Sequence, residues 1–316
     1  MDRNRKRFAS SHRAPAAAAM LVFCVALTIE GADGSGVALR VSEDADSVRV
    51  FAGDREILEY RRVPSPNKPY VRKLYSPGGI QVLRDEPADH RHHHALMFAL
   101  GANGVNFWEE RDGGGLQRPR STKLLKGGRG QGAGLSQRLD WVDPGSNGTV
   151  LVELRSISMT QEADPPATVL TWQTRLEAHR GGAAVQLGGS HYFGLGLRFV
   201  ESMDLGGRFF NAEGLEGETV RRTEKLTAVR WCAYAAAVDG RPVTVAVLDH
   251  PRNPRHPARM FTMTSPFAYL AATMNLWKDP WEVRAGRPLT LTYGVVVWDG
   301  DPGPEQVEAL YRRWAR

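Results

Sequence analysis

Apolar and polar residues alternate with a period of two along much of this chain. The alternation, or a short run of β-branched residues, fills segments that are separated mainly by Gly, Pro, Asp, Asn and Ser: 37–42, 47–52, 56–62, 149–160, 168–179, 228–238, 242–250, 267–277 and 288–300. Such a pattern predicts β-strands with one buried face. Because strand follows strand without amphipathic helices between them, we expect an antiparallel all-β fold.

Helical periodicity is clear only near the C-terminus. There, Pro304 offers a helix start, and apolar residues follow at i, i+3, i+4 and i+7, namely Val307, Leu310, Tyr311 and Trp314. We therefore expect residues 35–316 to form a single large antiparallel β-sandwich domain with a short C-terminal helix. The glycine-rich stretch 111–135 is expected to be a mobile loop between strands, or alternatively a lid over a site.

The N-terminus has a different composition. Residues 1–13 are basic, residues 14–29 are apolar, and the residues after them are small and polar. This order predicts a secretory signal peptide at 1–34, hence export to the periplasm or the medium and no membrane association after its removal. An uncleaved anchor is the alternative. Cys232 is the one cysteine outside this segment, so no intramolecular disulfide is expected.

Composition narrows the function classes. The chain has 316 residues, of which 42% are hydrophobic and 24% charged, which is enough apolar material for a large core. The net charge of +6 comes from scattered basic residues, with no nucleic-acid-binding motif. We therefore expect a small-molecule or oligosaccharide partner and no nucleic acid.

The stretch "DEPADHRHHHALMFALGANGVNFW", residues 85–108, holds the densest candidate chemistry, with His90, His92, His93 and His94. If residues 89–96 are extended, His90, His92 and His94 share one face, and Asp89 and His93 share the other. His90 and His92 could then ligate a divalent transition metal ion. Alternatively, they could act as general acid and base, with Asp89 orienting a ring. A plain surface group remains the third possibility.

A second polar cluster lies in "LDHPRNPRHPARMF", residues 248–261. A strand ends there at Asp249 and His250, and three prolines restrict the loop that follows. A stiff loop of this kind could present Asp249, His250 and Asn253 to a ligand, or it could simply be a rigid connection. Trp108 is placed at a strand end, where an aromatic face could stack on a sugar ring.

The segment "NKPYVRKLYSPGGIQVLRDEPADHRHHHALMFALGANGVNFWEE", together with "FGLGLRF", "VAVLDHPRNPRHP" and "YGVVVWDG", resembles the family labelled methane oxygenase PmoA. The resemblance covers roughly residues 63–314 and implies a supersandwich of the galactose-mutarotase-like kind that works in carbohydrate metabolism. The matching residues are Asp89, His90, His92, His93, Asp249, His250, Asn253 and Pro254. One departure is His94-Ala95, where the family usually has Arg-Gly.

These observations lead to one function hypothesis and two alternatives. The first is an exported carbohydrate-active enzyme, of epimerase, lyase or hydrolase type, with a histidine-rich site. The expected catalytic residues are His90, His92, His250 and Asp89, and the expected substrate-binding residues are Arg84, His93, Asp249, Asn253 and Trp108. The alternatives are a non-catalytic carbohydrate-binding β-sandwich, and a metal-dependent oxygenase or hydrolase, as the family label suggests.

Overall fold

The structure is a computed structural model that describes residues 37–64, 66–128, 131–179 and 182–316, all of which belong to one compact unit. The predicted signal peptide at 1–34 lies outside the described residues. The described chain folds into three antiparallel sheets, one 3-10 turn η1 (Glu201–Met203) and one α-helix, α1 (Pro304–Trp314). It contains no α-helix with the length and apolar character of a membrane span. The predicted all-β class is confirmed.

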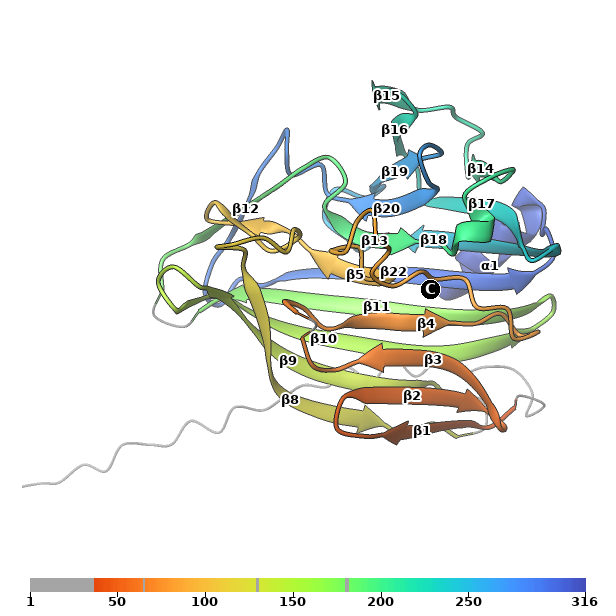
Figure 1. The fold of residues 1–316 in the computed structure, drawn as a ribbon, viewed down its shortest axis with the longest axis horizontal. Coiled ribbons are helices and arrows are strands. Elements are labelled where there is room, and N and C mark those ends of the chain that lie inside the picture. Colours follow the sequence, from red (N-terminus) through yellow and green to blue (C-terminus); the bar gives the residue numbers. More distant parts are fainter. Residues whose placement is uncertain (1–36, 65, 129–130, 180–181) are drawn as a thin grey trace, which may run out of the picture. The chain divides into compact units, whose positions relative to one another are not determined.

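Two large sheets form the body of the fold (Figure 1). The ten-stranded sheet has the order β1 (Leu39–Glu43), β2 (Ser47–Ala52), β3 (Arg55–Arg61), β4 (Tyr70–Leu74), β5 (Leu96–Ala99), β13 (Gly194–Arg198), β20 (Tyr269–Thr273), β19 (Arg259–Met263), β16 (Glu224–Ala228) and β15 (Glu218–Arg221). The eight-stranded sheet has the order β14 (Arg208–Asn211), β17 (Trp231–Val238), β18 (Arg241–Asp249), β22 (Leu289–Asp299), β11 (Pro166–Ala178), β10 (Gly148–Ala163), β9 (Ala133–Asp143) and β8 (Leu116–Leu125). A small sheet joins β21 (Trp281–Val283), β12 (Val185–Gly188), β6 (Gly101–Ala102) and β7 (Val105–Asn106).

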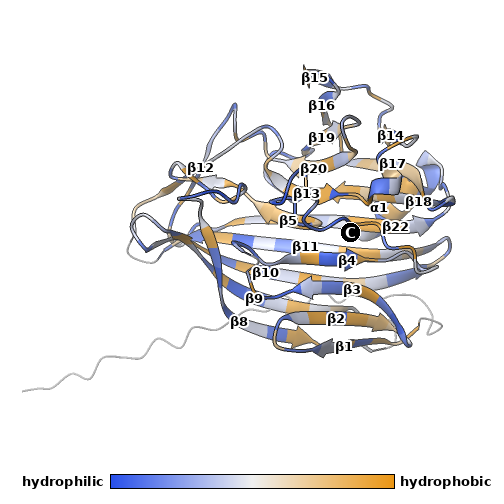
Figure 2. Ribbon diagram, in the orientation of Figure 1, coloured by the Kyte–Doolittle hydropathy of each residue, from blue (hydrophilic) through white to orange (hydrophobic). Residues whose placement is uncertain are grey.

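The apolar faces of the two large sheets pack against each other, as the alternating hydropathy of their strands requires (Figure 2). Phe98 of β5 meets Trp141 of β9 at 6.2 Å between ring centroids, and Tyr60 of β3 donates its hydroxyl to Gln137 Oε1 of β9 at 2.6 Å. The far face of the eight-stranded sheet is covered by α1, through the buried side chains Val307, Leu310 and Tyr311. The predicted sandwich with a C-terminal helix is therefore correct.

The core between the sheets also holds a polar network. Glu153 and Arg155, both fully buried on β10, form an ion pair at 2.9 Å. Arg155 also donates to the Tyr60 hydroxyl and to Gln117 Oε1, and Glu153 accepts from the Trp141 indole. Each charged atom thus has partners, which is the condition under which a buried ion pair is tolerated.

The prediction of a loop at 111–135 is wrong. Leu116–Leu125 forms β8, the edge strand of the eight-stranded sheet, which pairs with β9. Its polar and basic residues and Pro119 hide the strand from a hydrophobicity pattern, because an edge strand with exposed side chains needs little apolar content.

The outward face of the ten-stranded sheet is set by the alternation along β13 and β20. Leu195 is paired with Phe98, which faces the core, so Gly194, Gly196 and Arg198 face outward. By the same register, Tyr269 and the other odd-numbered residues of β20 face outward beside them. Small residues at 194 and 196 leave space over the sheet for side chains from the covering loops.

Candidate functional site

The histidine stretch forms consecutive turns, so the predicted extended strand over 89–96 is wrong. The amide of His90 donates to the Pro87 carbonyl at 3.0 Å, and the amide of His93 donates to the His90 carbonyl at 2.9 Å. Ala95 then takes a φ of 42° before β5 begins at Leu96. The turn hydrogen bonds replace the alternation that a strand would impose, and this regroups the imidazoles.

Three imidazoles gather on one side of the turn. The ring centroids of His90 and His93 are 4.7 Å apart, those of His92 and His93 are 4.6 Å apart, and those of His90 and His92 are 5.7 Å apart. Asp89 reaches His90 Nδ1 with Oδ2 at 3.1 Å. The predicted grouping of His90 with His92 and of Asp89 with a ring is therefore present, but His93 joins this group and His94 does not.

His94 is buried on the opposite side, where it anchors the turn. Its Nδ1 lies 3.3 Å from Asp85 Oδ1, its Nε2 lies 2.8 Å from Glu110 Oε1, and its ring stacks on Tyr70 at 4.4 Å. Burial opposes a charge on His94, but the bonds to the two carboxylates outweigh it and raise the pKa of the imidazole.

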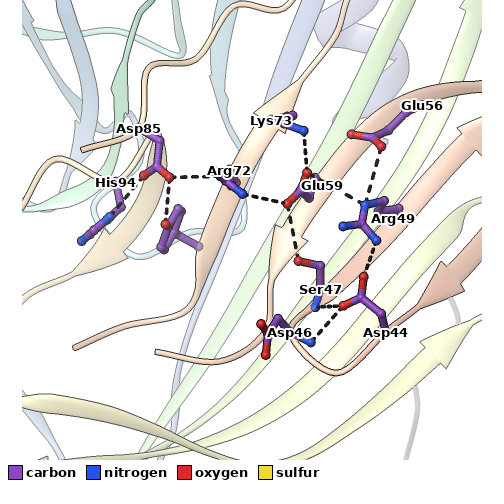
Figure 3. Close-up of polar contacts among 11 residues, drawn as sticks. Asp44, Asp46, Ser47, Arg49, Glu56, Glu59, Arg72, Lys73, Asp85 and His94 are labelled. Atoms are coloured by element: carbon purple, nitrogen blue, oxygen red, sulfur yellow. Dashed lines mark hydrogen bonds and ion pairs between the residues drawn. The ribbon is translucent and has the colours of Figure 1, made fainter. Parts of the chain in front are cut away.

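A chain of charges continues from this anchor across β4 and β3 (Figure 3). Asp85 Oδ2 lies 3.3 Å from Arg72 Nε, and Arg72 in turn reaches Glu59 at 3.5 Å. On the other side, the fully buried Lys68 donates its ammonium to Glu110 at 2.6 Å. The histidine turn is thus fixed to the sheet by carboxylates that are themselves paired.

The floor beneath the three imidazoles comes from the outward face of β13 and β20. The His93 ring lies 5.2 Å from the Tyr269 ring, and the Arg198 guanidinium lies 3.6 Å over the Phe267 ring. A methyl group at Gly196 would overlap both the Tyr269 hydroxyl and the Trp108 ring. Glycine at this position is therefore what lets these two side chains approach the sheet.

Four buried polar atoms at this place have no hydrogen-bond partner among the described residues. They are His93 Nδ1, Trp108 Nε1, Arg198 Nε and the Tyr269 hydroxyl, which make up four of the nine such side-chain atoms found in the described residues. Their side chains are at most 8% exposed. Leaving a buried donor or acceptor unpaired costs about 1–3 kcal/mol each. Buried polar atoms without a protein partner are groups that an ordered water molecule or a polar ligand satisfies.

Burial keeps two of these imidazoles, those of His92 and His93, neutral. Burial lowers the pKa of His93 to about 2, helped by the neighbouring imidazoles and Arg198. Burial also lowers the pKa of His92, again with help from His90 and from Lys68. Both rings are therefore free bases at neutral pH and can accept a proton or a hydrogen bond.

Arg198 and Asp89 supply the charges of the site. Burial lowers the pKa of Arg198, while Asp204, at 3.1 Å, and Asp89, at 3.8 Å, act against this effect. Burial alone would raise the pKa of Asp89, but the hydrogen bond with His90 and the field of Arg198 lower it. The site thus combines a guanidinium, a carboxylate and neutral imidazoles.

Two further predicted residues sit beside this group. Arg84 pairs with Glu201 at 3.1 Å and lies 3.8 Å from Asp204, the carboxylate that it shares with Arg198. Trp108 is fully buried, and its face is stacked on Phe193 at 5.1 Å with an 11° angle between planes. The expectation that Trp108 stacks on a ligand ring is therefore wrong, because the whole ring is buried and Phe193 covers one of its faces. Its buried indole N–H has no hydrogen-bond partner among the described residues.

The second predicted cluster, Asp249, His250 and Asn253, stabilises the loop in which it lies. Asn253 donates to Asp249 Oδ1 at 2.7 Å and bridges to the Thr292 backbone, while the Ala258 amide donates to Asp249 Oδ2 at 2.7 Å. His250 Nδ1 accepts from the Arg252 amide at 3.1 Å. No hydrogen bond, ion pair or ring contact within the described ranges joins Asp249, His250 or Asn253 to the three imidazoles, so the structure does not bring the two clusters together.

Sequence reasoning missed Arg198 and Tyr269. The signal was present in "FGLGLRF", where glycine alternates with apolar residues and the strand ends in arginine. Glycine at i and i+2 of a strand marks a face that something else approaches closely.

Metal binding by His90 and His92 stays a prediction. In the described part of the chain, the group of at least three His, Cys, Asp or Glu residues with ligand atoms within 4.8 Å of one another is Asp85, Glu86 and His94. Neither His90 nor His92 belongs to it. The Asp85 and His94 atoms of that group already bond to each other, and Asp85 also accepts from Tyr70.

The fold and this site define an all-β sandwich protein with an imidazole-rich polar site on the outward face of one sheet. Residues 47–312 match the model of a family described as "Family of unknown function (DUF6807)", and the chain belongs to that family. The assignment to a PmoA family is therefore wrong, and the oxygenase alternative loses the label that suggested it. A search of curated proteins finds no match.

Two solved structures resemble the fold at very low sequence identity. One is the galactosidase domain of α-galactosidase-sucrose kinase, AgaSK, with 9% identity and a TM-score of 0.45 over 83% of this chain. The other is the α-galactosidase from Lactobacillus brevis, with 7% identity and a TM-score of 0.48 over 87% of this chain. The alignments span 41% and 42% of those two chains.

Proposed function

We propose that this protein is an exported carbohydrate-active enzyme whose sugar site is the group formed by His90, His92, His93, Arg198 and Tyr269. The observation that carries the proposal is the cluster of buried polar atoms without partners on the outward face of β13 and β20. A sugar presents several hydroxyl groups, each able to donate and to accept, so it can satisfy guanidinium, indole and phenol donors and an imidazole acceptor at one place.

The division of roles follows from burial and charge. His93, Arg198 and Tyr269 are almost fully buried. Their role is to form hydrogen bonds with the hydroxyl groups of the sugar. His92 is half-buried, and its lowered pKa leaves it unprotonated at neutral pH, so it is the candidate general base. His90, held by Asp89, is the candidate partner in proton transfer. Such a pair suits proton transfer at a sugar carbon or at a glycosidic oxygen. Epimerase, lyase and hydrolase reactions all require a proton transfer of this kind.

The test is to incubate the purified chain with a panel of mono- to tetrasaccharides of galactose, glucose, mannose, xylose and the hexuronic acids, and to follow the mixtures by NMR. We expect one sugar series to be bound and converted, His92→Gln to abolish conversion while binding persists, and the exposed His179→Gln control to behave as wild type. Conversion by His92→Gln at the wild-type rate would remove the role of His92.

The same panel of sugars distinguishes the enzyme from the second candidate, a non-catalytic carbohydrate-binding protein. The burial that makes His93 neutral also suits it to a pure hydrogen-bonding role, which a binding protein would need. Saturable binding without conversion would favour that candidate and overturn the enzyme assignment. If none of the sugars binds, both candidates fail.

A further inference from the structure

A hollow lies farther along the same outward face, where β19 begins and β20 ends. It has a volume of about 340 Å³, and its lining includes Arg255, His256, Arg259, Thr273, Asn275 and Asp279. Thr273 faces outward like Tyr269, four residues earlier on β20. At about 3.3 Å per residue, roughly 13 Å separate the two positions. An extended ligand could therefore occupy both places.

His256 is held in one orientation at this hollow. Its Nδ1 lies 2.6 Å from Asp249 Oδ2, and Asp249 is 1% exposed. Asn253 and the Ala258 amide fix the same carboxylate. A carboxylate at Nδ1 selects the tautomer with the proton on that nitrogen, so Nε2 is left as an acceptor. The Asp249 network, which does not reach the three imidazoles, thus orients a different imidazole.

The hollow carries one uncompensated positive charge. Arg255 forms an ion pair with Asp279 at 2.8 Å and donates to the Met274 carbonyl at 3.1 Å. The exposed Arg259 has no side-chain hydrogen bond or ion pair among the described residues. A guanidinium free of partners matches the two oxygens of a carboxylate.

Aromatic side chains connect the two places. Trp108 contacts Tyr192 at 5.6 Å, Tyr192 contacts His191 at 5.2 Å, and His191 contacts Trp277 at 5.7 Å, all between ring centroids. Trp277 is 40% exposed and belongs to the segment between Met274 and Asp279, which both line the hollow. The Lys278 ammonium lies 4.9 Å over one face of the Trp277 ring, which leaves the other face for stacking against a sugar ring.

We propose that the hollow binds the carboxylate of an acidic sugar residue, so that the ligand of this protein is a uronate-containing oligosaccharide. Arg259 pairs with the carboxylate, His256 Nε2 accepts from a ring hydroxyl, and Trp277 supports the sugar that lies between the hollow and the histidine site. The inference rests on the proposed function, because only a sugar bound at the histidine site makes the second position part of the same ligand.

The test compares oligomers of galacturonate and glucuronate, from one to four residues, with galactose and glucose oligomers of the same lengths. Affinities are measured by calorimetry for the wild type, Arg259→Gln and the control Arg287→Gln, which removes an equally exposed arginine outside the hollow. We expect the wild type to bind uronate oligomers at least tenfold more tightly than neutral ones. Arg259→Gln should abolish this preference without weakening neutral binding, and Arg287→Gln should keep it.

The two proposals fail differently. Neutral and acidic oligomers that bind equally well to the wild type, or a preference that survives Arg259→Gln, would overturn the acidic-sugar inference while leaving the histidine site intact. A preference shown equally by free acetate would assign the hollow to a bare carboxylate and also overturn the inference. The histidine site is checked in the same series by Tyr269→Phe, which should weaken both kinds of oligomer; no loss in either kind would count against the proposed function itself.

Discussion

Replacing Tyr269 with phenylalanine removes one oxygen atom and should move stability and ligand affinity in opposite directions. The hydroxyl belongs to a side chain that is 3% exposed, and it has no hydrogen-bond partner among the described residues. Burying an unpaired hydroxyl costs about 1–3 kcal/mol, so its removal should raise the free energy of unfolding by about 1 kcal/mol. For a domain of this size the melting temperature should rise by roughly 2 °C.

The same substitution should weaken sugar binding. The lost hydrogen bond is worth about 0.5–1.5 kcal/mol, which corresponds to a dissociation constant roughly two- to thirteenfold larger. Urea unfolding gives the stability change, and calorimetry with the sugar found in the panel gives the affinity change.

Tyr60→Phe is the matched control. Its hydroxyl is also buried, but it donates to Gln137 at 2.6 Å and accepts from Arg155 at 3.3 Å. Removing it leaves those groups unpaired and should lower the free energy of unfolding by about 1–3 kcal/mol. A Tyr269→Phe protein destabilised as much as Tyr60→Phe would show that the Tyr269 hydroxyl is satisfied in the free protein, and would refute its assignment to the ligand.

Three further outcomes follow from the same contacts. Glu110→Gln should lower the free energy of unfolding by about 3–5 kcal/mol, because it leaves the fully buried Lys68 without its carboxylate. Chemical denaturation measures this change. The double variant Lys68→Met/Glu110→Gln, which removes both charges, should have a free energy of unfolding closer to that of the wild type. His93 binds fewer protons when folded, with a pKa of about 2, than when unfolded, with a pKa of about 6.5, so stability should fall by up to about 1.4 kcal/mol per pH unit as the pH drops below about 6.5. His93→Gln should lack this component in urea unfolding between about pH 4 and 7, and an unchanged slope would contradict the burial of the neutral ring. Gly196→Ala should abolish sugar binding by displacing the Tyr269 and Trp108 side chains, whereas Gly188→Ala, where a methyl group meets open space, should bind as wild type; normal binding by Gly196→Ala would speak against this packing.

The fold class could be read from the chain because alternation is a local property. The strand β10 buries every second residue from Leu151 to Met159, and α1 buries the predicted Val307, Leu310 and Tyr311. The edge strand β8 escaped because its side chains are exposed or half-buried apart from Gln117, so no alternation is required of it. Periodicity therefore identifies strands with one buried face, whereas strands buried on both faces, such as β5 and β13, show no alternation.

The site could be predicted only where its residues are adjacent in the chain. His90, His92 and His93 were found because they are neighbours in sequence, although the turn that groups them was not. Arg198 and Tyr269 are brought to them by the pairing of β13 with β20, a contact between distant segments that no local pattern encodes. His94 looked equivalent to its neighbours, and only the positions of Asp85 and Glu110 distinguish it.

The edge strand β8 has a consequence for how the protein behaves at high concentration. An open edge of a β-sheet offers unpaired backbone groups to any other extended chain, and proteins that leave such an edge apolar tend to aggregate. Here the edge carries Arg118, Pro119, Arg120 and Lys123, and its register is interrupted between Pro119 and Ser121. The basic residues that hide the strand from a hydrophobicity pattern also repel a second copy of the chain, and the interrupted register prevents regular backbone pairing with it. This edge of the sheet is therefore protected against self-association.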